Sequence, residues 1–207
     1  MLDQLKCAID KTVQQFQKYP CDFLSERDIQ ALLFVDLRNA TSDLRYPYDA
    51  KGDNFKFGFR EPFCIHPVTT EYFPYKRGLD RFDLAVLSEK PDSASAIWRQ
   101  PCRVGIEIKL WQPGYGEPNH RMDVEKLQRY QVYLQETFTQ ERAFTGIALL
   151  FIHPCAETLL GSLVSGEKSG DPYPENGLAL HYVTRRDHWW KQQLPAPSIP
   201  EQVTSFA

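Results

Sequence analysis

The sequence predicts an α/β protein in which a mixed central β-sheet is flanked by helices. Three observations predict this class. Residues 2–18 and 121–137 carry apolar side chains at the three-to-four spacing of an amphipathic helix. Residues 81–87 and 103–111 have the composition and the two-residue alternation of strands. Residues 145–153 form an apolar run, which is typical of a strand buried on both faces of a sheet.

Length and composition allow one domain with a sizeable core, and no repeat or linker divides the chain. The chain has 24 lysines and arginines against 27 aspartates and glutamates, for a formal net charge of −3. This balance lacks the basic footprint common in nucleic-acid-binding proteins, although a local basic patch would be enough. No apolar run has the length of a membrane span, so we expect no membrane partner. The five cysteines are far apart and lack zinc-ligand spacing, which indicates reduced thiols in a cytoplasmic protein.

Two helices open the chain. The first, 2–18, is followed by Pro20, which cannot continue it. The second begins after Ser25, a good N-cap residue, with Asp28 three positions later as in a capping box. Glu26 falls on the apolar stripe of this second helix and is therefore expected to point inward, although a first-turn carboxylate is also favoured by the helix dipole alone. The residues of that stripe are Ile29, Leu33 and Leu37.

Residues 38–67 contain proline, glycine and many aromatic side chains. We expect a loop with one or two short strands here, which forms either a flap over a site or a surface excursion with its own small apolar cluster. A strand is predicted to follow over residues 69–75.

The strand over 81–87 carries a carboxylate in an apolar run. On one face we expect Phe82, Leu84 and Val86; on the other, Asp83 lies with Ala85 and Leu87. A buried, unpaired carboxylate costs several kcal/mol or changes its pKa strongly. Asp83 therefore needs a partner, which could be a basic side chain (Arg81 or Lys109), a backbone donor or a metal ion.

The strand over 103–111 places Glu107 and Lys109 on one face, roughly 7 Å apart along the strand. The opposite face carries Val104, Ile106, Ile108 and Leu110. The carboxylate of Glu107 can hold a hard divalent cation, and the ammonium group of Lys109 can orient a water or neutralise charge on a phosphate. The same two residues would also fit a solvated strand face with a weak ion pair.

The helix over 121–137 brings further polar groups toward these strand ends. Its inward stripe consists of Asp123, Leu127, Tyr130 and Leu134. Four polar side chains near its start could reach a site there or could simply belong to an ordinary amphipathic helix. They are Asp123, Lys126, Gln128 and Tyr130.

The C-terminal part begins with a strand over 178–184, which we expect to be the last one. Residues 185–191 form the most basic and aromatic cluster of the chain. Such a cluster can stack bases and hold phosphates, but a terminal helix pinned by tryptophans is the preferred interpretation. The proline-rich stretch from residue 194 onward predicts a flexible tail over 194–207.

Two common catalytic motifs are missing from the sequence. There is no Gly-x-Ser-x-Gly elbow of the serine hydrolases. The glycine-rich stretch at 161–169 has its lysine one position late for a phosphate-binding loop and follows a helix rather than a strand. Neither a serine hydrolase nor a P-loop nucleotide-binding protein is therefore predicted.

The order helix, three strands, helix, buried strand resembles the restriction-endonuclease-like superfamily, the PD-(D/E)xK nucleases. Arg-Phe-Asp83-Leu-Ala-Val looks like the strand that carries the first acid of that motif, although Phe82 stands where the motif has proline. Ile-Glu107-Ile-Lys109 looks like its (D/E)xK strand, and Glu26 matches the acid often found on the first core helix.

The pattern Asp-x-x-Lys-Leu at Asp123 to Leu127 is similar to the helix after the motif in several subfamilies. The resemblance implies a restriction-endonuclease-like αβββαβ core over about 25–153, with an extra N-terminal helix, inside a single nuclease-like domain of residues 1–207.

The resemblance also implies a function and roles for four residues. Asp83, Glu107 and Glu26 would hold Mg²⁺ or Mn²⁺, and Lys109 would position the attacking water or stabilise charge on the phosphate. The implied activity is hydrolysis of phosphodiester bonds by metal-activated water, with a nucleic acid, expected to be DNA, as the partner. Many enzymes of this fold dimerise, so a homodimer is a further expectation.

Two other functions remain open at this point. The chain could be a catalytically silent nuclease-fold module for binding or scaffolding, which acts through a nucleic-acid or protein partner. It could also be a metal-dependent enzyme with a different substrate, since its net charge is mildly negative. The presence of Asp83, Glu107 and Lys109 together argues against the silent module, which would be expected to lose one of them.

Overall fold

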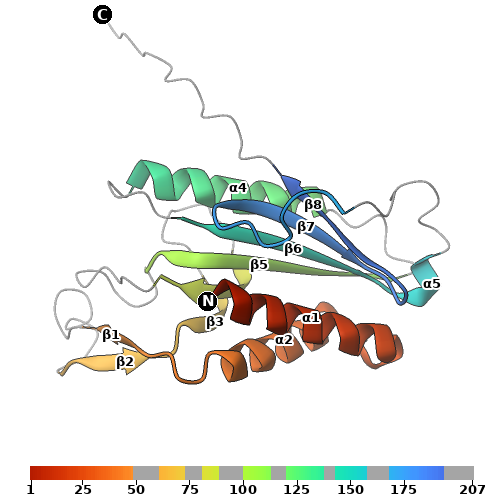
Figure 1. Cartoon of the computed structure of the whole chain (residues 1–207), viewed down its shortest axis with the longest axis horizontal. Coiled ribbons are helices and arrows are strands. Elements are labelled where there is room, and N and C mark those ends of the chain that lie inside the picture. The colour runs from red at the N-terminus through yellow and green to blue at the C-terminus, as the bar shows by residue number, and fades with distance from the viewer. Residues whose placement is uncertain are drawn as a thin grey trace, which may run out of the picture.

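The computed structural model describes residues 1–48, 61–72, 81–88, 100–112, 120–137, 143–157 and 168–193. In these residues a six-stranded sheet lies between two layers of helix (Figure 1). Helices α1 (Leu2–Lys18) and α2 (Glu26–Ala40) cover one face, and helix α4 (His120–Thr137) covers the other. The prediction of an α/β protein with a sheet flanked by helices is confirmed.

The sheet is mixed, and its strands follow one another in chain order. They are β3 (Val68–Tyr72), β4 (Phe82–Leu87), β5 (Cys102–Trp111), β6 (Thr145–Ile152), β7 (Gly177–Val183) and β8 (His188–Gln193). Strands β5, β6 and β7 are parallel, whereas the β3–β4, β4–β5 and β7–β8 pairs are antiparallel. Strand β5 therefore has an antiparallel neighbour on one side and a parallel one on the other.

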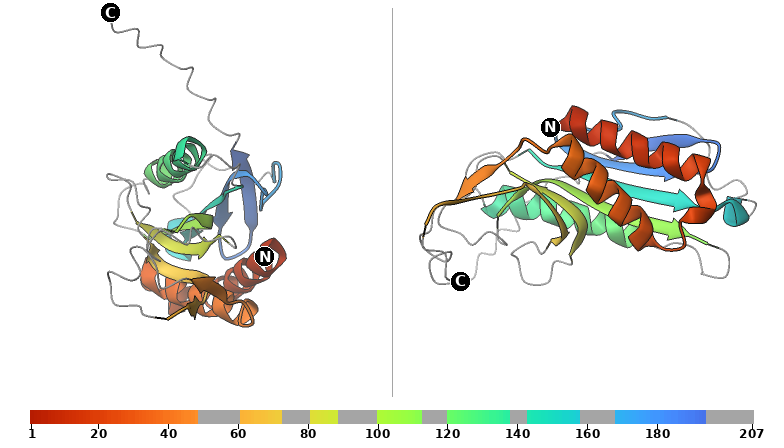
Figure 2. Two further views of the ribbon diagram at one scale, coloured as in Figure 1. Left: turned by 90° about the vertical axis from the view of Figure 1, so that its left-hand side faces the viewer. Right: turned by 90° about the horizontal axis from the view of Figure 1, so that it is seen from below.

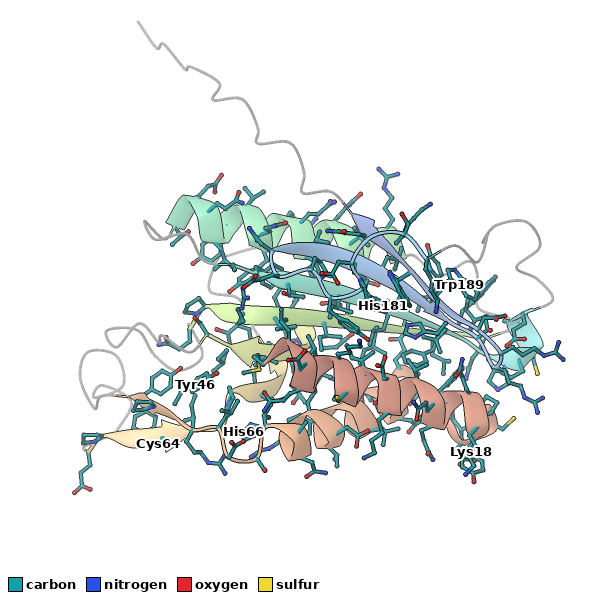
Figure 3. All side chains as sticks on the ribbon, viewed as in Figure 1. Lys18, Tyr46, Cys64, His66, His181 and Trp189 are labelled. Carbon is teal, nitrogen blue, oxygen red and sulfur yellow. The ribbon has the colours of Figure 1, made fainter. Side chains whose placement is uncertain are left out.

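Four smaller elements complete the described part of the chain. Strands β1 (Tyr46–Tyr48) and β2 (Phe63–Ile65) form a separate antiparallel pair at one end of the molecule (Figure 1). Figure 3 labels His66 beside this pair, and its ring nitrogen Nε2 lies 3.1 Å from the carbonyl oxygen of Thr41 at the end of α2. A 3₁₀ turn η1 (Pro20–Asp22) and a short helix α5 (Pro154–Glu157) lie elsewhere. The expectation of one or two short strands within residues 38–67 is confirmed.

Helix α1 begins and ends where the sequence predicts, and helix α2 begins at the predicted place. Helix α2 starts directly after Ser25, because the Asp28 carboxylate accepts the backbone N–H of Ser25 at 2.8 Å. The two helices lie side by side across the sheet (Figure 2, right). Their apolar stripes are buried at Leu5, Ile9, Val13, Phe16, Ile29, Leu33 and Leu37.

The predicted alternation of β5 is also confirmed. Val104, Ile106 and Ile108 lie in the core layer beneath α1 and α2. Gly105 faces α4, where an added Cβ would lie 3.0 Å from the ring of Phe144, so glycine lets the helix layer approach the strand closely. Strand β6 is buried along its whole length, as predicted for a central strand.

One expectation about β4 is wrong. Phe82 does not share a face with Leu84 and Val86: it packs edge-on against Tyr130 of α4, with ring centroids 5.1 Å apart, while Leu84 and Val86 lie beneath α1 and α2. The cause is a local irregularity, because the register of β3 and β4 skips the position of Glu71 and Asp83. Glu71 has a φ of 51°, which ordinary strand residues do not adopt. The break in alternation carries Phe82 to the α4 side.

The expected terminal helix is also wrong, because residues 188–193 form an eighth strand. Strand β8 pairs antiparallel with β7, so the strand over 178–184 is not the last one. Trp189 stacks on its cross-strand partner Tyr182 with ring planes 12° apart, and Figure 3 shows Trp189 and His181 on these two strands. Aromatic cross-strand pairs of this kind favour a strand over a helix.

The outer edge of β8 is covered over part of its length. The backbone N–H of Ser169 donates to Trp190 O at 2.9 Å, and the N–H of Gln192 donates to Ser169 O at 2.9 Å. The predicted flexible tail, 194–207, lies outside the described residues. None of the described helices has the combination of length and apolar character that crossing a bilayer requires.

Candidate functional site

The second half of β5 is where four acidic and two basic side chains from different elements meet. Asp83 comes from β4, and its Oδ2 accepts a hydrogen bond from the backbone N–H of Ile108 at 2.7 Å. The regular pairing of β4 with β5 ends nearby, at Leu84 opposite Ile106. A side-chain carboxylate thus takes the N–H that a strand carbonyl would otherwise accept.

Gln30 of α2 hydrogen-bonds to the backbone of Asp83, where the regular pairing of β4 with its neighbouring strands is interrupted. Its Nε2 donates to Asp83 O at 2.7 Å and to Glu71 Oε1 at 3.2 Å. Gln30 was not among the residues predicted for the site. Its position could have indicated a place in the site, because Gln30 follows Glu26 by four residues on α2 and residues four apart lie on the same side of a helix.

Glu26 and Lys109 meet at the start of α2. Glu26 Oε1 accepts the backbone N–H of Leu110 at 3.4 Å, and its Oε2 lies 3.5 Å from Lys109 Nζ. The same ammonium group lies 3.9 Å from Asp123 Oδ2 on α4. Lys109 therefore joins both helix layers across the end of β5, and with 34% of its side chain exposed it remains accessible from solvent.

Glu107 is held by Lys126 rather than by its neighbour on the strand. Lys126 Nζ donates to Glu107 Oε2 at 2.6 Å and to Arg81 O at 2.9 Å. Glu107 is only 2% exposed, and its other oxygen, Oε1, has no hydrogen-bond partner within the described part of the chain. A buried carboxylate oxygen in that condition is costly, so a proton, a water molecule or a ligand at Oε1 would lower the free energy.

Three groups of this cluster have pKa values that differ from their ordinary values. Burial raises the pKa of Glu107 to about 8, the nearby charge of Asp83 adds to this rise, and Lys126 opposes it. Burial also raises the pKa of Asp83, against the lowering effect of the Ile108 N–H and of Lys126. For Lys109, burial lowers the pKa, but the surrounding carboxylates, Asp123 foremost, raise it above its ordinary value on balance.

When all groups are ionised, four carboxylates face two ammonium groups, which leaves a formal charge of −2. The carboxylates are Glu26, Asp83, Glu107 and Asp123; the ammonium groups are Lys109 and Lys126. Excess negative charge in a mostly buried place is unfavourable unless protons or a cation balance it. Carboxylate oxygens are the ligands that Mg²⁺ and Mn²⁺ prefer, so the donor set and the unsatisfied Glu107 Oε1 fit such an ion.

The side chains as they stand do not form a finished metal cage. In the described ranges no three His, Cys, Asp or Glu side chains are grouped closely enough to hold a metal ion. Lys126 occupies Glu107 Oε2, and the Ile108 N–H occupies Asp83 Oδ2. Binding a divalent cation would therefore require one of these carboxylates, or Lys126, to move.

The other residues predicted near the site divide into two groups. Asp123 and Lys126 are brought to it by α4, through Lys109 and Glu107. Gln128 is half-buried on the same helix. Tyr130 lies in the core, where its hydroxyl accepts the backbone N–H of Cys102 at 2.9 Å, toward the start of β5 and roughly 16 Å along the strand from Glu107.

The arrangement is suited to acid–base or metal-assisted chemistry. It combines the buried Glu107 and the half-buried Asp83, both with raised pKa values, with the accessible ammonium group of Lys109.

Comparison of this chain with protein-family models, with curated proteins and with solved structures gave no match.

Proposed function

We propose that this chain is a metal-dependent nuclease that hydrolyses phosphodiester bonds, with DNA as its substrate. The observation that carries the proposal is Glu107, a carboxylate buried beside Asp83 with one oxygen lacking a hydrogen-bond partner in the described residues. A divalent cation would satisfy that oxygen and keep both acids ionised.

The arrangement of elements supports a restriction-endonuclease-like core as part of this proposal. Helix α2 is followed by β3, β4 and β5 as an antiparallel run, and then by α4 and the parallel strand β6. This is the αβββαβ order that the sequence resemblance implies. Both acids of the motif and its lysine lie on β4 and β5 of this run.

Asp83, Glu107 and Glu26 are the residues that would hold the cation. When bound, Mg²⁺ or Mn²⁺ would supply Lewis-acid activation of a water and neutralise charge at the phosphate. The chain itself fixes the orientation of Asp83 through the Ile108 N–H. Lys109, held between Glu26 and Asp123, presents an ammonium group that can stabilise negative charge on the phosphate or orient the water.

The proposal is tested by incubating the purified chain with DNA and RNA in Mg²⁺, in Mn²⁺ or in EDTA. We expect cleavage of DNA that requires metal and falls by a factor on the order of 10²–10³ or more in Lys109→Ala and Glu107→Gln. Arg121→Ala is a matched control, since Arg121 is exposed on α4 and pairs with Glu125 rather than with the site acids. Full metal-dependent activity in either site variant would refute the assignment.

A second candidate function is a silent nuclease-fold module that binds or scaffolds through a partner. The observation that favours it is the Glu107–Lys126 ion pair, in which a lysine already balances the buried acid. Calorimetric titration with Mg²⁺ and Mn²⁺ separates the two functions. Binding at millimolar metal supports the nuclease, whereas no heat of binding at those concentrations supports the silent module.

A further inference from the structure

We propose that Lys126 is a resident counter-ion that holds the place of a divalent cation at Glu107, so that metal binding requires its ammonium group to leave the Glu107 carboxylate. This inference rests on the proposed function and concerns the regulation of the same site. Lys126 is a positioning residue in this role, because it acts through Glu107 and not on the substrate.

The contacts of Lys126 show how it is held. Its Nζ lies 2.6 Å from Glu107 Oε2 and 2.9 Å from Arg81 O, and only 12% of its side chain is exposed. An ammonium group has three donors, and these two acceptors engage two of them. Lys126 is thus anchored between the start of β4 and the middle of β5.

The ammonium group and a divalent cation compete for the same carboxylate. A lysine at hydrogen-bond distance from Oε2 occupies that oxygen, and its positive charge repels a second cation that approaches Oε1. In a site with low dielectric this repulsion is much stronger than in water. A cation that binds Glu107 with both oxygens can do so only when Lys126 has moved away.

A place for the displaced ammonium group lies on the same helix. Asp123 precedes Lys126 by three residues, and residues three apart on a helix are neighbours on its surface. Asp123 is mostly buried and already lies near Lys109. Lys126 can therefore swing from Glu107 toward solvent and still remain near a negative charge on its own helix.

The first test follows Lys126 itself in the wild-type chain. Limited acetylation of amines, followed by peptide mass spectrometry, reports how accessible each lysine is with and without saturating Mg²⁺. We expect the labelling of Lys126 to rise several-fold with Mg²⁺, while exposed Lys6 on α1 is labelled equally in both conditions. In Glu107→Ala, which removes the acceptor of the Lys126 hydrogen bond, labelling of Lys126 should be high from the start and insensitive to Mg²⁺. Unchanged labelling of Lys126 in the wild type would overturn the proposal.

The second test measures Mg²⁺ affinity by calorimetry at about pH 9, where proton competition for Glu107 is small. Lys126→Met removes the charge and keeps an unbranched side chain, so it should bind Mg²⁺ about tenfold more tightly than the wild type. Lys126→Arg keeps the charge and should bind like the wild type. Equal or weaker binding by Lys126→Met would overturn the counter-ion role.

The outcomes separate this proposal from the nuclease function. Equal Mg²⁺ binding by wild type and Lys126→Met removes the counter-ion role and leaves the metal site standing. Release of Lys126 by Mg²⁺ without cleavage of DNA or RNA keeps the counter-ion role and removes the nuclease. If neither protein binds Mg²⁺ at millimolar concentration, the counter-ion role and the metal-dependent nuclease both fail.

Discussion

The backbone N–H of Ile108 donates a hydrogen bond of 2.7 Å to the carboxylate of Asp83. The acid of β4 thereby completes the hydrogen bonding of β5 at the point where the two strands cease to pair regularly. The Asp83 carboxylate thus accepts a hydrogen bond that supports the fold, and it is also proposed to bind the metal ion. Substitution can separate these two roles, because only metal binding requires a negative charge.

Asp83→Asn should keep the fold, and Asp83→Ala should not keep it as well. The amide oxygen of asparagine can still accept the Ile108 N–H, whereas alanine leaves that buried donor without a partner, at a cost of about 1–3 kcal/mol. Urea unfolding followed by circular dichroism measures the difference. Both variants should lose nuclease activity. Equal stability of the alanine variant and the wild type would show that the hydrogen bond contributes nothing to the fold.

The metal-free chain should lose stability as the pH rises through the neutral range. Burial raises the pKa of Glu107 from its ordinary value of 4.5 to about 8 in the folded state, so between these values the folded chain keeps a proton that the unfolded chain releases. The stabilisation is full below the lower value and is lost as the pH rises through the upper one, by up to about 1.4 kcal/mol per pH unit.

Urea unfolding in EDTA across this pH range measures the effect, with Glu107→Gln as the comparison. Glutamine does not titrate, so its stability curve should lack this downward slope. Added Mg²⁺ should restore the stability of the wild type most strongly at high pH, where the carboxylate is ionised. Parallel curves for the two proteins in EDTA would contradict the assignment of the slope to Glu107.

His181 should produce the opposite slope on the acid side. It is fully buried, its Nε2 donates to Pro172 O at 2.8 Å, and its Nδ1 accepts from His188 Nε2 at 3.0 Å. Burial, with a further contribution from His188, lowers the pKa of His181 from 6.5 to about 3. Below pH 6.5 His181 therefore binds a proton in the unfolded chain but stays neutral in the folded chain. The stabilisation present above that pH is lost as the pH falls toward 3.

His181→Gln is the matched test of this acid-side loss. Glutamine can donate to Pro172 O and accept from His188 but does not titrate in this range, so its unfolding free energy should fall less between the two pKa values. Chemical unfolding at several pH values, compared with the wild type, gives the answer. If the unfolding free energy of both proteins falls equally over this acid range, the fall does not come from His181.

Gly146→Ala should destabilise the chain through crowding at the centre of the sheet. An added Cβ would lie 2.1 Å from Leu178 Cδ2 on β7 and 3.2 Å from the ring of Phe144. Overpacking of this kind costs about 1–3 kcal/mol. The double variant Gly146→Ala/Leu178→Ala should be more stable than the sum of the two single changes predicts, because the second substitution removes the clashing atom. Additive effects would mean that the two residues do not compete for space.

The helices and the central strands were predictable because local patterns determine them. The capping pair Ser25 and Asp28 places the start of α2, and the alternation along β5 separates Val104, Ile106 and Ile108 from Glu107. Residues beyond such patterns were predicted less well. The side of the sheet on which Phe82 lies depends on the irregular pairing of β3 with β4, which involves Glu71 on the neighbouring strand.

Strand β8 and the partner of Glu107 escaped prediction for the same physical reason. The tryptophans of β8 gain their strand conformation from cross-strand contacts with β7, which a local reading of residues 185–191 does not contain. Likewise, Glu107 and Lys109 suggest an ion pair by their spacing, but the position of α4 gives Glu107 the ammonium group of Lys126 and gives Lys109 the carboxylate of Asp123. Only the packing of the helix on the sheet decides this exchange of partners.

The segment around Ser169 has a consequence for self-association. Its backbone groups bond to Trp190 O and to the Gln192 N–H, the main-chain groups that a further strand would need at the border of the sheet. A second copy cannot extend the sheet there by strand addition without first displacing this segment. A dimer formed by strand addition would therefore need either another border of the sheet, such as β3, or displacement of this segment.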